Sequence, residues 1–246
     1  MQCQSLAAIG ARLAVCAVVL APGQIAAQSS VELEQEVQQA LRRDRDLRRV
    51  GVAVTGSEVT LTGELETFWA KSEAIRRTLE VKGVETVASE LVIPPPESDE
   101  ALAEAVGQAI QRYPHYSVFD YLDGGIDTGV VTLWGKVTAD REKADEIFER
   151  VAKIQGVQDV RSDIQTMTPS TADVNLRRSI FQAVSRSTHF ERVSRARNPP
   201  FHIIVERSVV TLVGYVQGEI EYRELERIAR QTQGVLRVDN QLQRVQ

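Results

Sequence analysis

Apolar residues recur at helical spacing in three separate stretches of this 246-residue chain. In each stretch four apolar positions stand at i, i+4, i+7 and i+8, which places them on one face of an α-helix. The pattern therefore predicts three amphipathic helices. Their apolar positions are Leu33, Val37, Ala40 and Leu41; Leu102, Val106, Ala109 and Ile110; and Leu176, Ile180, Ala183 and Val184.

Alternating β-branched residues follow each helix and predict a β-hairpin. The second strand of each hairpin carries the text Val-Thr-Leu-x-Gly, which occurs at residues 59–63, 131–135 and 210–214. We expect its glycine to let the chain leave the sheet and approach a helix closely. In the second copy, Asp123-Gly124-Gly125 is expected to break up the first strand of the hairpin.

A second helical stretch, a Gly-Val pair and a β-strand complete each repeat. Gly83, Gly156 and Gly234 are expected at the C-caps of these helices. A strand, a helix and a strand in this order predict a right-handed crossover between parallel strands. The apolar faces of the three helices are Ala74, Ile75, Thr78 and Leu79; Ala144, Ile147, Phe148 and Val151; and Leu225, Ile228, Ala229 and Thr232.

The repeat as a whole predicts an α+β protein of three tandem αββαβ modules. Each module is expected to lay two helices on one face of a small mixed sheet of three strands. We expect Pro94-Pro95-Pro96 to form a stiff spacer, and the polar residues 166–171 to form a more flexible one. Because units of this size are marginal alone, neighbouring modules are expected to pack together. The predicted modules span residues 30–94, 98–168 and 172–246.

The N-terminal residues 1–27 have the pattern of a secretory signal peptide. A short apolar core at residues 13–21 follows Arg12, and Ile25-Ala26-Ala27 offers small residues for cleavage. Both cysteines of the chain, Cys3 and Cys16, fall in this segment, so no disulfide is expected in the mature protein. We predict export to the periplasm. The alternative is an uncleaved N-terminus that anchors the protein in the membrane.

Together these motifs resemble the BON domain, a module of bacterial periplasmic and outer-membrane proteins. The third repeat is the most typical, because its Gly-Val pair is followed by Val238-Asp239-Asn240-Gln241-Leu242. The resemblance implies a non-enzymatic module that binds phospholipid or maintains the cell envelope, and some members resemble periplasmic chaperones. The matching residues are structural, so the resemblance supplies no catalytic or cofactor-binding residue.

Charge is divided unevenly among the three modules. Residues 28–96 carry 9 basic and 12 acidic residues, residues 97–169 carry 7 and 14, and residues 170–246 carry 12 and 8. A basic run in the third module is either a solvated face or a contact with anionic lipid headgroups, worth roughly 1 kcal/mol per basic residue. An acidic protein would also fit it. The candidate binding residues in this run are Arg177, Arg178, Arg186, Arg192, Arg195 and Arg197.

A second candidate surface opens the second helix of module 1. Phe68, Trp69 and Lys71 combine aromatic and basic side chains, which suits a membrane interface. The competing interpretation is that Trp69 packs across the boundary between two modules.

The chain shows no pattern typical of catalysis or metal binding. His115, His189 and His202 share no metal-ligand spacing, and the acidic residues around Gly124-Gly125 lack the register of a calcium loop. We therefore predict no enzyme activity, no cofactor and no metal. Nucleic acid is not expected as a partner of an exported protein, and no small-molecule substrate is indicated.

Two functional hypotheses follow from these observations. The first is a non-enzymatic periplasmic protein that binds an anionic phospholipid surface and supports cell-envelope integrity under osmotic or related stress. The alternative is a chaperone-like or scaffold protein that binds other envelope proteins and also uses the acidic middle module.

Overall fold

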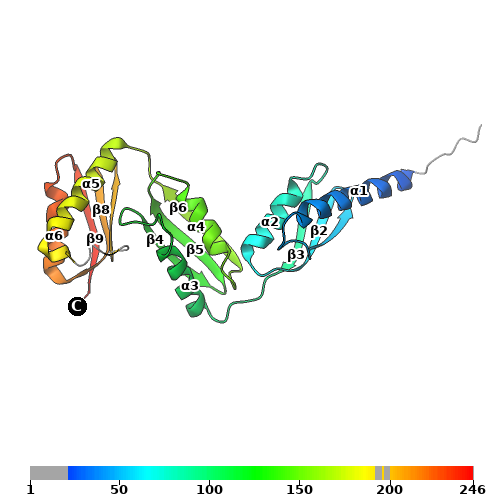
Figure 1. Ribbon diagram of the computed structural model, residues 1–246, viewed down its shortest axis with the longest axis horizontal. Helices are drawn as coiled ribbons and strands as arrows, with labels where there is room; N and C mark the ends of the chain where they lie inside the picture. Colours follow the sequence, from blue (N-terminus) through cyan, green and yellow to red (C-terminus); the bar gives the residue numbers. More distant parts are fainter. Residues whose placement is uncertain (1–21, 192–195, 197–199, 246) are drawn as a thin grey trace, which may run out of the picture.

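Three folded modules follow one another along the longest axis of the molecule (Figure 1). The computed structural model describes residues 22–191, 196 and 200–245, without the side chains of residues 22–29. Each module contains a three-stranded sheet with its second strand in the centre, in the orders β1-β2-β3, β4-β5-β6 and β7-β8-β9. The predicted α+β architecture of tandem αββαβ modules is therefore confirmed.

Module 1 shows how the apolar pattern builds one unit. Strand β2 pairs antiparallel with β1 and parallel with β3, as the crossover through α2 requires. Val37 and Leu41 on α1 are fully buried against Val59 and Leu61 of β2. The elements are α1 (Pro22–Arg42), β1 (Gly51–Thr55), β2 (Glu58–Glu64), α2 (Phe68–Leu79) and β3 (Thr86–Val92).

Module 2 repeats this order but keeps its first strand intact. The Gly124-Gly125 pair does not interrupt β4, because all seven residues of the strand pair with β5. A Cβ atom at Gly124 would lie 2.7 Å from the carbonyl oxygen of Thr132, so the glycine permits a close approach of the two strands. The elements are α3 (Asp99–Gln111), β4 (Tyr121–Asp127), β5 (Val130–Val137), α4 (Lys143–Ala152) and β6 (Asp159–Thr166).

Module 3 has the longest strands and the largest core cluster, which also includes Val118 from module 2. Its elements are α5 (Thr171–Arg186), the 3₁₀ turn η1 (Thr188–Phe190), β7 (Phe201–Glu206), β8 (Val209–Gln217), α6 (Gly218–Gln231) and β9 (Arg237–Val245). Among the described residues of all three modules, no helix is both long and apolar enough to cross a membrane.

A carboxylate at the start of the first helix holds the hairpin turn in modules 2 and 3. Asp173 accepts hydrogen bonds from the backbone N–H groups of Arg207 and Ser208 at 2.9 and 2.8 Å. Both turn residues have positive φ, which is unfavourable for residues other than glycine. Asp99 accepts from Thr128 and Gly129 in the same way. The helix therefore fixes the hairpin to which it is packed.

The glycine of the Val-Thr-Leu-x-Gly motif does not end its strand, contrary to the prediction. Strands β2, β5 and β8 continue past Gly63, Gly135 and Gly214. All three glycines have positive φ. A Cβ atom at Gly135 would lie 2.1 Å from the carbonyl oxygen of Tyr121 on the neighbouring strand. The close approach is therefore to the first strand of the hairpin and not to a helix.

The glycine of the Gly-Val pair is not the C-cap residue of the second helix, contrary to the prediction. The C-cap residues are Glu80, Lys153 and Thr232, two to three positions before the respective glycines. In module 3 a Cβ atom at Gly234 would lie 3.2 Å from the Leu176 side chain on α5. The glycine thus lets the turn after the second helix approach the first helix.

Candidate functional site

Modules 2 and 3 are joined by the segment between α3 and β4. Val118 of this segment is buried in the core of module 3, and its carbonyl oxygen accepts a hydrogen bond from Ile203 N at 2.7 Å. Phe119 packs edge-to-face on Phe181 of α5, with ring centroids 5.8 Å apart. The module 2 segment therefore supplies part of the hydrophobic core of its neighbour.

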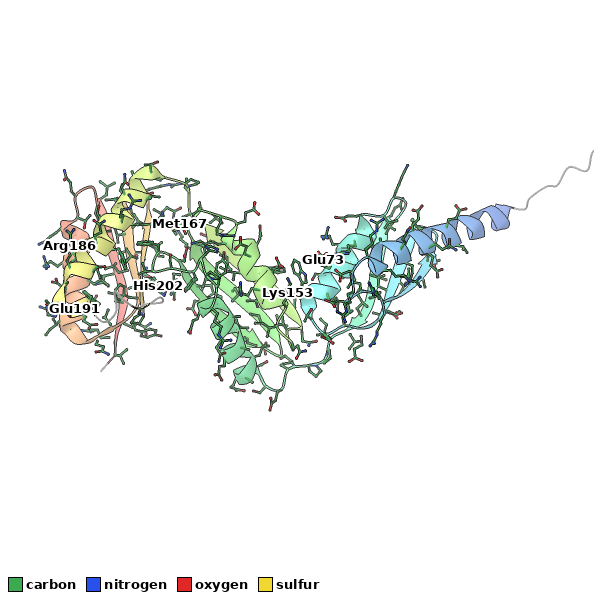
Figure 2. All side chains as sticks on the ribbon, in the orientation of Figure 1. Glu73, Lys153, Met167, Arg186, Glu191 and His202 are labelled. Atoms are coloured by element: carbon green, nitrogen blue, oxygen red, sulfur yellow. The ribbon has the colours of Figure 1, made fainter. Side chains whose placement is uncertain are left out.

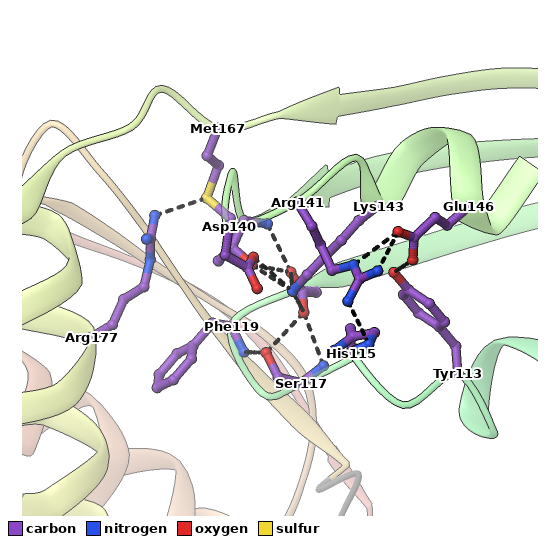
Figure 3. A network of polar contacts seen from close by, with 12 residues as sticks. Tyr113, His115, Ser117, Phe119, Asp140, Arg141, Lys143, Glu146, Met167 and Arg177 are labelled. Atoms are coloured by element: carbon purple, nitrogen blue, oxygen red, sulfur yellow. Dashed lines mark hydrogen bonds and ion pairs between the residues drawn. The ribbon is translucent and has the colours of Figure 1, made fainter.

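Asp120 holds this segment in place through a polar network, in which Figure 3 labels its partners Ser117 and Lys143. Its carboxylate is fully buried and accepts hydrogen bonds from the backbone N–H and hydroxyl groups of Ser117 and Thr138. Lys143, at the start of α4, completes the set with its ammonium group 2.9 Å from the carboxylate. Asp140 lies 3.1 Å from the same ammonium group. The buried charges are thus paired and hydrogen-bonded, as a low-dielectric interior demands.

A crevice of about 840 Å³ opens beside this network, between module 2 and α5 of module 3. Phe119, Phe181 and Val174 give it apolar walls. Arg177 and Arg178 line the same crevice from α5. An apolar recess with adjacent cations suits an anionic ligand that also carries an apolar part.

Arg177 is largely buried, which differs from its predicted role at an exposed face. Its side chain donates to the carbonyl oxygen of Val205 at 2.5 Å and lies 3.3 Å from the sulfur of Met167. Its Nε is buried without a hydrogen-bond partner, and none of its contacts within the described residues is an ion pair. Burial lowers the pKa of the guanidinium, although Asp173 partly opposes this effect. Arg177 therefore has a structural role beneath the crevice. Its side chain alone does not offer an exposed charge to a lipid headgroup.

The other predicted arginines do not all share one face. Arg178 is exposed at the crevice. Arg186 is also exposed, but it lies at the end of module 3 that is turned away from module 2 (Figure 2). The remaining predicted residues of the basic run, Arg192, Arg195 and Arg197, lie outside the described residues.

Phe68 and Trp69 pack across the boundary between modules 1 and 2, as the competing interpretation of Trp69 expected, and not at a membrane interface. Phe68 meets Phe148 of α4 edge-to-face at 6.4 Å. The ammonium group of Lys153, which is labelled in Figure 2, lies 5.1 Å from the Trp69 ring centroid, a cation–π geometry. Both rings contact the core of module 2. Lys71 is half-buried on the same helix.

The linkers between modules are also held by contacts. Gln158 donates to the carbonyl oxygen of Pro94 at 2.8 Å, so the proline spacer rests on module 2. In the second linker Met167 is buried, and its N–H donates to Val137 O at 2.9 Å. The flexibility that we expected from the polar composition of residues 166–171 is thus limited by one apolar side chain.

Two of the three histidines are exposed, and the third lies on a strand of module 3 that faces module 2. His115 and His189 are exposed beyond the ends of α3 and α5. His202 lies on β7 between Tyr116 and Tyr121 of module 2, with both ring centroids 5.6 Å away. Burial lowers the pKa of His202, and the neighbouring backbone of Asp120 and Ser117 partly opposes this effect. Among the described residues, no cluster of His, Cys, Asp and Glu could hold a metal ion.

Apart from Arg177 and Arg178, sequence reasoning missed the residues that line the crevice and those of the polar network beside it. Asp120 carried one available signal, since a carboxylate three residues after Ser117 is typical of a local hydrogen-bonded turn. Lys143 and Phe181 carried none, because their roles depend on contacts with residues distant in the sequence.

The fold defines a protein of repeated αββαβ modules, with a crevice between the second and the third. The model of the BON domain family matches residues 29–95 and 172–246, more than half of the chain. The protein therefore belongs to the BON domain family, a family of binding domains. The middle module lies between the two matched segments.

Comparison with solved structures gives distant similarities. One is the C-terminal domain of CdsD, a structural protein of the type III secretion system of Chlamydia trachomatis, with 12% identity and a TM-score of 0.25 over 88% of this chain and 98% of that chain. A second structure of CdsD shares 13% identity, with a TM-score of 0.25 over 87% of this chain and 94% of that one. No curated protein matches the chain.

Proposed function

We propose that this protein binds anionic phospholipid at a membrane surface of the bacterial envelope, and that the crevice between modules 2 and 3 receives the lipid. The observation that supports the proposal is the pair Arg177 and Arg178 beside the apolar walls of one crevice. The negative headgroup contacts exposed Arg178 and compensates the buried charge of Arg177. The acyl chain lies against Phe119 and Phe181.

The same proposal places the protein in the periplasm, where it acts by binding and catalyses no reaction. This part rests on the N-terminal sequence and on membership of the BON domain family. A role in envelope integrity under osmotic or related stress is consistent with lipid binding. Anchoring by an uncleaved N-terminus would also bring the crevice to a membrane.

Vesicle flotation tests the lipid proposal. The protein is mixed with vesicles of phosphatidylcholine alone or with added phosphatidylglycerol, and the bound fraction is measured. We expect binding that requires phosphatidylglycerol, with Arg178→Glu lowering the partition coefficient by about tenfold, because each basic residue contributes roughly 1 kcal/mol and the reversal adds repulsion.

Arg161→Glu is the matched control for this experiment. Arg161 lies on β6 with a largely exposed side chain, and its one ion pair within the described part of the chain is a long contact of 3.9 Å to Asp159, so the charge change is the same but outside the crevice. Equal losses in both variants would show a non-specific effect of net charge. Binding that is independent of phosphatidylglycerol would contradict the proposal.

Binding of other envelope proteins is a second candidate function. It is favoured by the position of β4 at the edge of its sheet, where β5 is its one neighbouring strand among the described residues.

A further inference from the structure

The end of module 3 that holds the turn between β7 and β8 exposes apolar and basic side chains together. Ser208 of this turn donates its N–H to Asp173 at 2.8 Å, and its carbonyl oxygen accepts a hydrogen bond from Leu236 N at 2.9 Å. These contacts bring together the turn, the start of α5 and the residue before β9. We call this surface the tip of module 3, and it consists of Val174, Arg207, Leu236 and Arg237.

Leu236 is the most exposed of the large apolar side chains in the described part of the chain, at 80%. Val174, which follows Asp173 on α5, is 43% exposed. A single exposed leucine is common on soluble proteins and has no functional meaning by itself. The equivalent positions of the other modules and the charges around Leu236 therefore decide its interpretation.

Module 2 has the same tip with different chemistry. The same backbone hydrogen bond joins Gln158 N to Gly129 O, and Asp99 holds the turn as Asp173 does in module 3. Two polar positions of module 2 become apolar in module 3, and two others become arginine. The residues of module 2 at the four positions are Glu100, Thr128, Gln158 and Asp159, in the order of Val174, Arg207, Leu236 and Arg237.

The side chain at the position of Leu236 forms hydrogen bonds within the protein in the other two modules. In module 1, Glu85 accepts from the Ser57 hydroxyl group at 2.9 Å. In module 2, Gln158 donates to the carbonyl oxygen of Pro94 at 2.8 Å, so the proline spacer rests on that tip. Module 3 instead presents an apolar side chain to solvent at this position.

Arg207 and Arg237 place positive charge beside the exposed leucine. Neither guanidinium group forms an ion pair with another residue that the structure describes. Two acidic neighbours are already engaged, because Glu206 is paired with Lys136 at 2.6 Å and Asp239 is hydrogen-bonded within β9. An apolar protrusion with adjacent cations suits an anionic lipid surface, where the apolar group enters the headgroup region and the cations meet the phosphates.

The tip lies beside the crevice between modules 2 and 3. Val174 belongs to both, and Ser170 and Thr171 at the start of α5 also line the crevice. The tip is at the opposite end of β7 from Pro200. Contact of the tip with a membrane therefore brings the crevice to the same surface.

We propose that the tip of module 3 docks on an anionic bilayer, with Leu236 inserted among the lipids and Arg207 and Arg237 at the headgroups. The inference assigns a membrane-contact site and determines which end of the module faces the bilayer. It rests on the proposed function for the kind of surface that is bound. The residues at the tip are different from the arginines of the crevice, so each part can fail alone.

A fluorescent label at the tip tests insertion directly. The full chain carries Cys3→Ser and Cys16→Ser, because these are its only cysteines, and Leu236→Cys is labelled with the dye NBD. Ile220→Cys is the matched control, since Ile220 is 67% exposed at the start of α6, after the other end of β8. With vesicles that contain phosphatidylglycerol, NBD emission at position 236 should rise several-fold and move to shorter wavelength. The label at position 220 should not change.

Substitutions at the tip separate its apolar and basic contributions. Leu236→Gln introduces the residue of module 2 and should lower the partition coefficient about tenfold, because the apolar contact with lipid is lost. Ile220→Gln should leave the partition coefficient unchanged. Arg207→Gln combined with Arg237→Gln should lower it about thirtyfold, the factor expected for two basic residues near an anionic surface.

The possible results distinguish the tip from the crevice. Vesicle binding without a change at position 236, or with equal changes at positions 236 and 220, would overturn the inference and leave the crevice proposal standing. A change at position 236 together with unaltered binding of Arg178→Glu would support the tip and contradict the crevice. No binding to phosphatidylglycerol vesicles would overturn both.

Discussion

Single residues in this protein act at positions that their neighbours in the sequence do not explain. Asp120 carries a charge at a fully buried position and is stabilised by five donor groups from two segments and a helix. Glu73 is different, because Arg76 and Arg77 on the same helix lower its pKa to about 2. The first interaction requires the tertiary fold, whereas the second follows from helical spacing.

Loss of the buried lysine is expected to destabilise modules 2 and 3. Lys143→Met leaves the Asp120 carboxylate buried without its cation, which should lower the free energy of unfolding by about 3–5 kcal/mol. Urea denaturation followed by circular dichroism measures the change. The double variant Asp120→Asn with Lys143→Met should recover part of the loss. A single variant as stable as the wild type would contradict the role of the pair.

We expect the free energy of unfolding to depend on pH because of His202. Its pKa is lowered in the folded protein, so below the unfolded value of about 6.5 the unfolded state binds more protons. The contribution of neutral His202 to stability is complete above pH 6.5. It declines as the pH falls towards the pKa of His202 in the folded protein. Urea midpoints at pH 7.5 and 5.5 should therefore differ more in the wild type than in His202→Gln. An equal difference would show that His202 does not titrate abnormally.

At the scale of elements, the backbone packs more closely around the glycine of the Val-Thr-Leu-x-Gly motif in module 2 than in module 1. The motif glycines Gly63 and Gly135 have similar φ values of 132° and 141°. A Cβ atom would lie 3.5 Å from a carbonyl oxygen at Gly63 but 2.1 Å from one at Gly135. Backbone conformation therefore requires glycine at both positions, and steric contact adds a second requirement at Gly135.

Alanine substitutions can separate these two requirements. Gly63→Ala should cost about 1 kcal/mol because of its positive φ. Gly135→Ala should cost several times more, since β4 and β5 must move apart. Thermal unfolding monitored by circular dichroism compares the two variants, with Gly107→Ala as a helical control that should be slightly stabilising. Equal costs at Gly63 and Gly135 would exclude the steric contribution.

The whole molecule is held together by two different junctions. Module 1 meets module 2 through Phe68 and Trp69, two half-buried rings that pack against the core of module 2 without being fully buried in it. Module 2 meets module 3 through Val118, which is part of the core of module 3, and through the 2.6 Å ion pair of Lys136 with Glu206. A shared core couples folding more strongly than a surface contact does.

We expect modules 2 and 3 to unfold together and module 1 to unfold separately. Val118→Ala should lower the stability of both later modules by about 2 kcal/mol, because it removes buried methyl groups from a shared core. Hydrogen exchange should show faster exchange in β5 and β8 but not in β2. Leu61→Ala, which truncates a buried side chain of module 1, should speed hydrogen exchange in β2 but not in β5 or β8. An effect of Val118→Ala confined to module 2 would contradict the shared core.

The sequence by itself determined the order and type of the elements. Periods of 3.6 and 2 in the apolar residues identified the helices and hairpins, and the repeated Val-Thr-Leu-x-Gly text identified three copies of one unit. This information is local, so it is readable along the chain. The glycines were recognised as special, but their contacts were assigned wrongly because the approaching atoms belong to distant residues such as Tyr121 and Leu176.

Only the tertiary structure decided which residues are available for binding. Arg177 and Trp69 have the chemistry of surface binding residues, but one lies beneath a crevice and the other at a module boundary. Exposure is set by the packing of modules on each other, and no local period encodes that packing. For the same reason the crevice beside Phe119 and Phe181 appears only when module 2 is packed on α5.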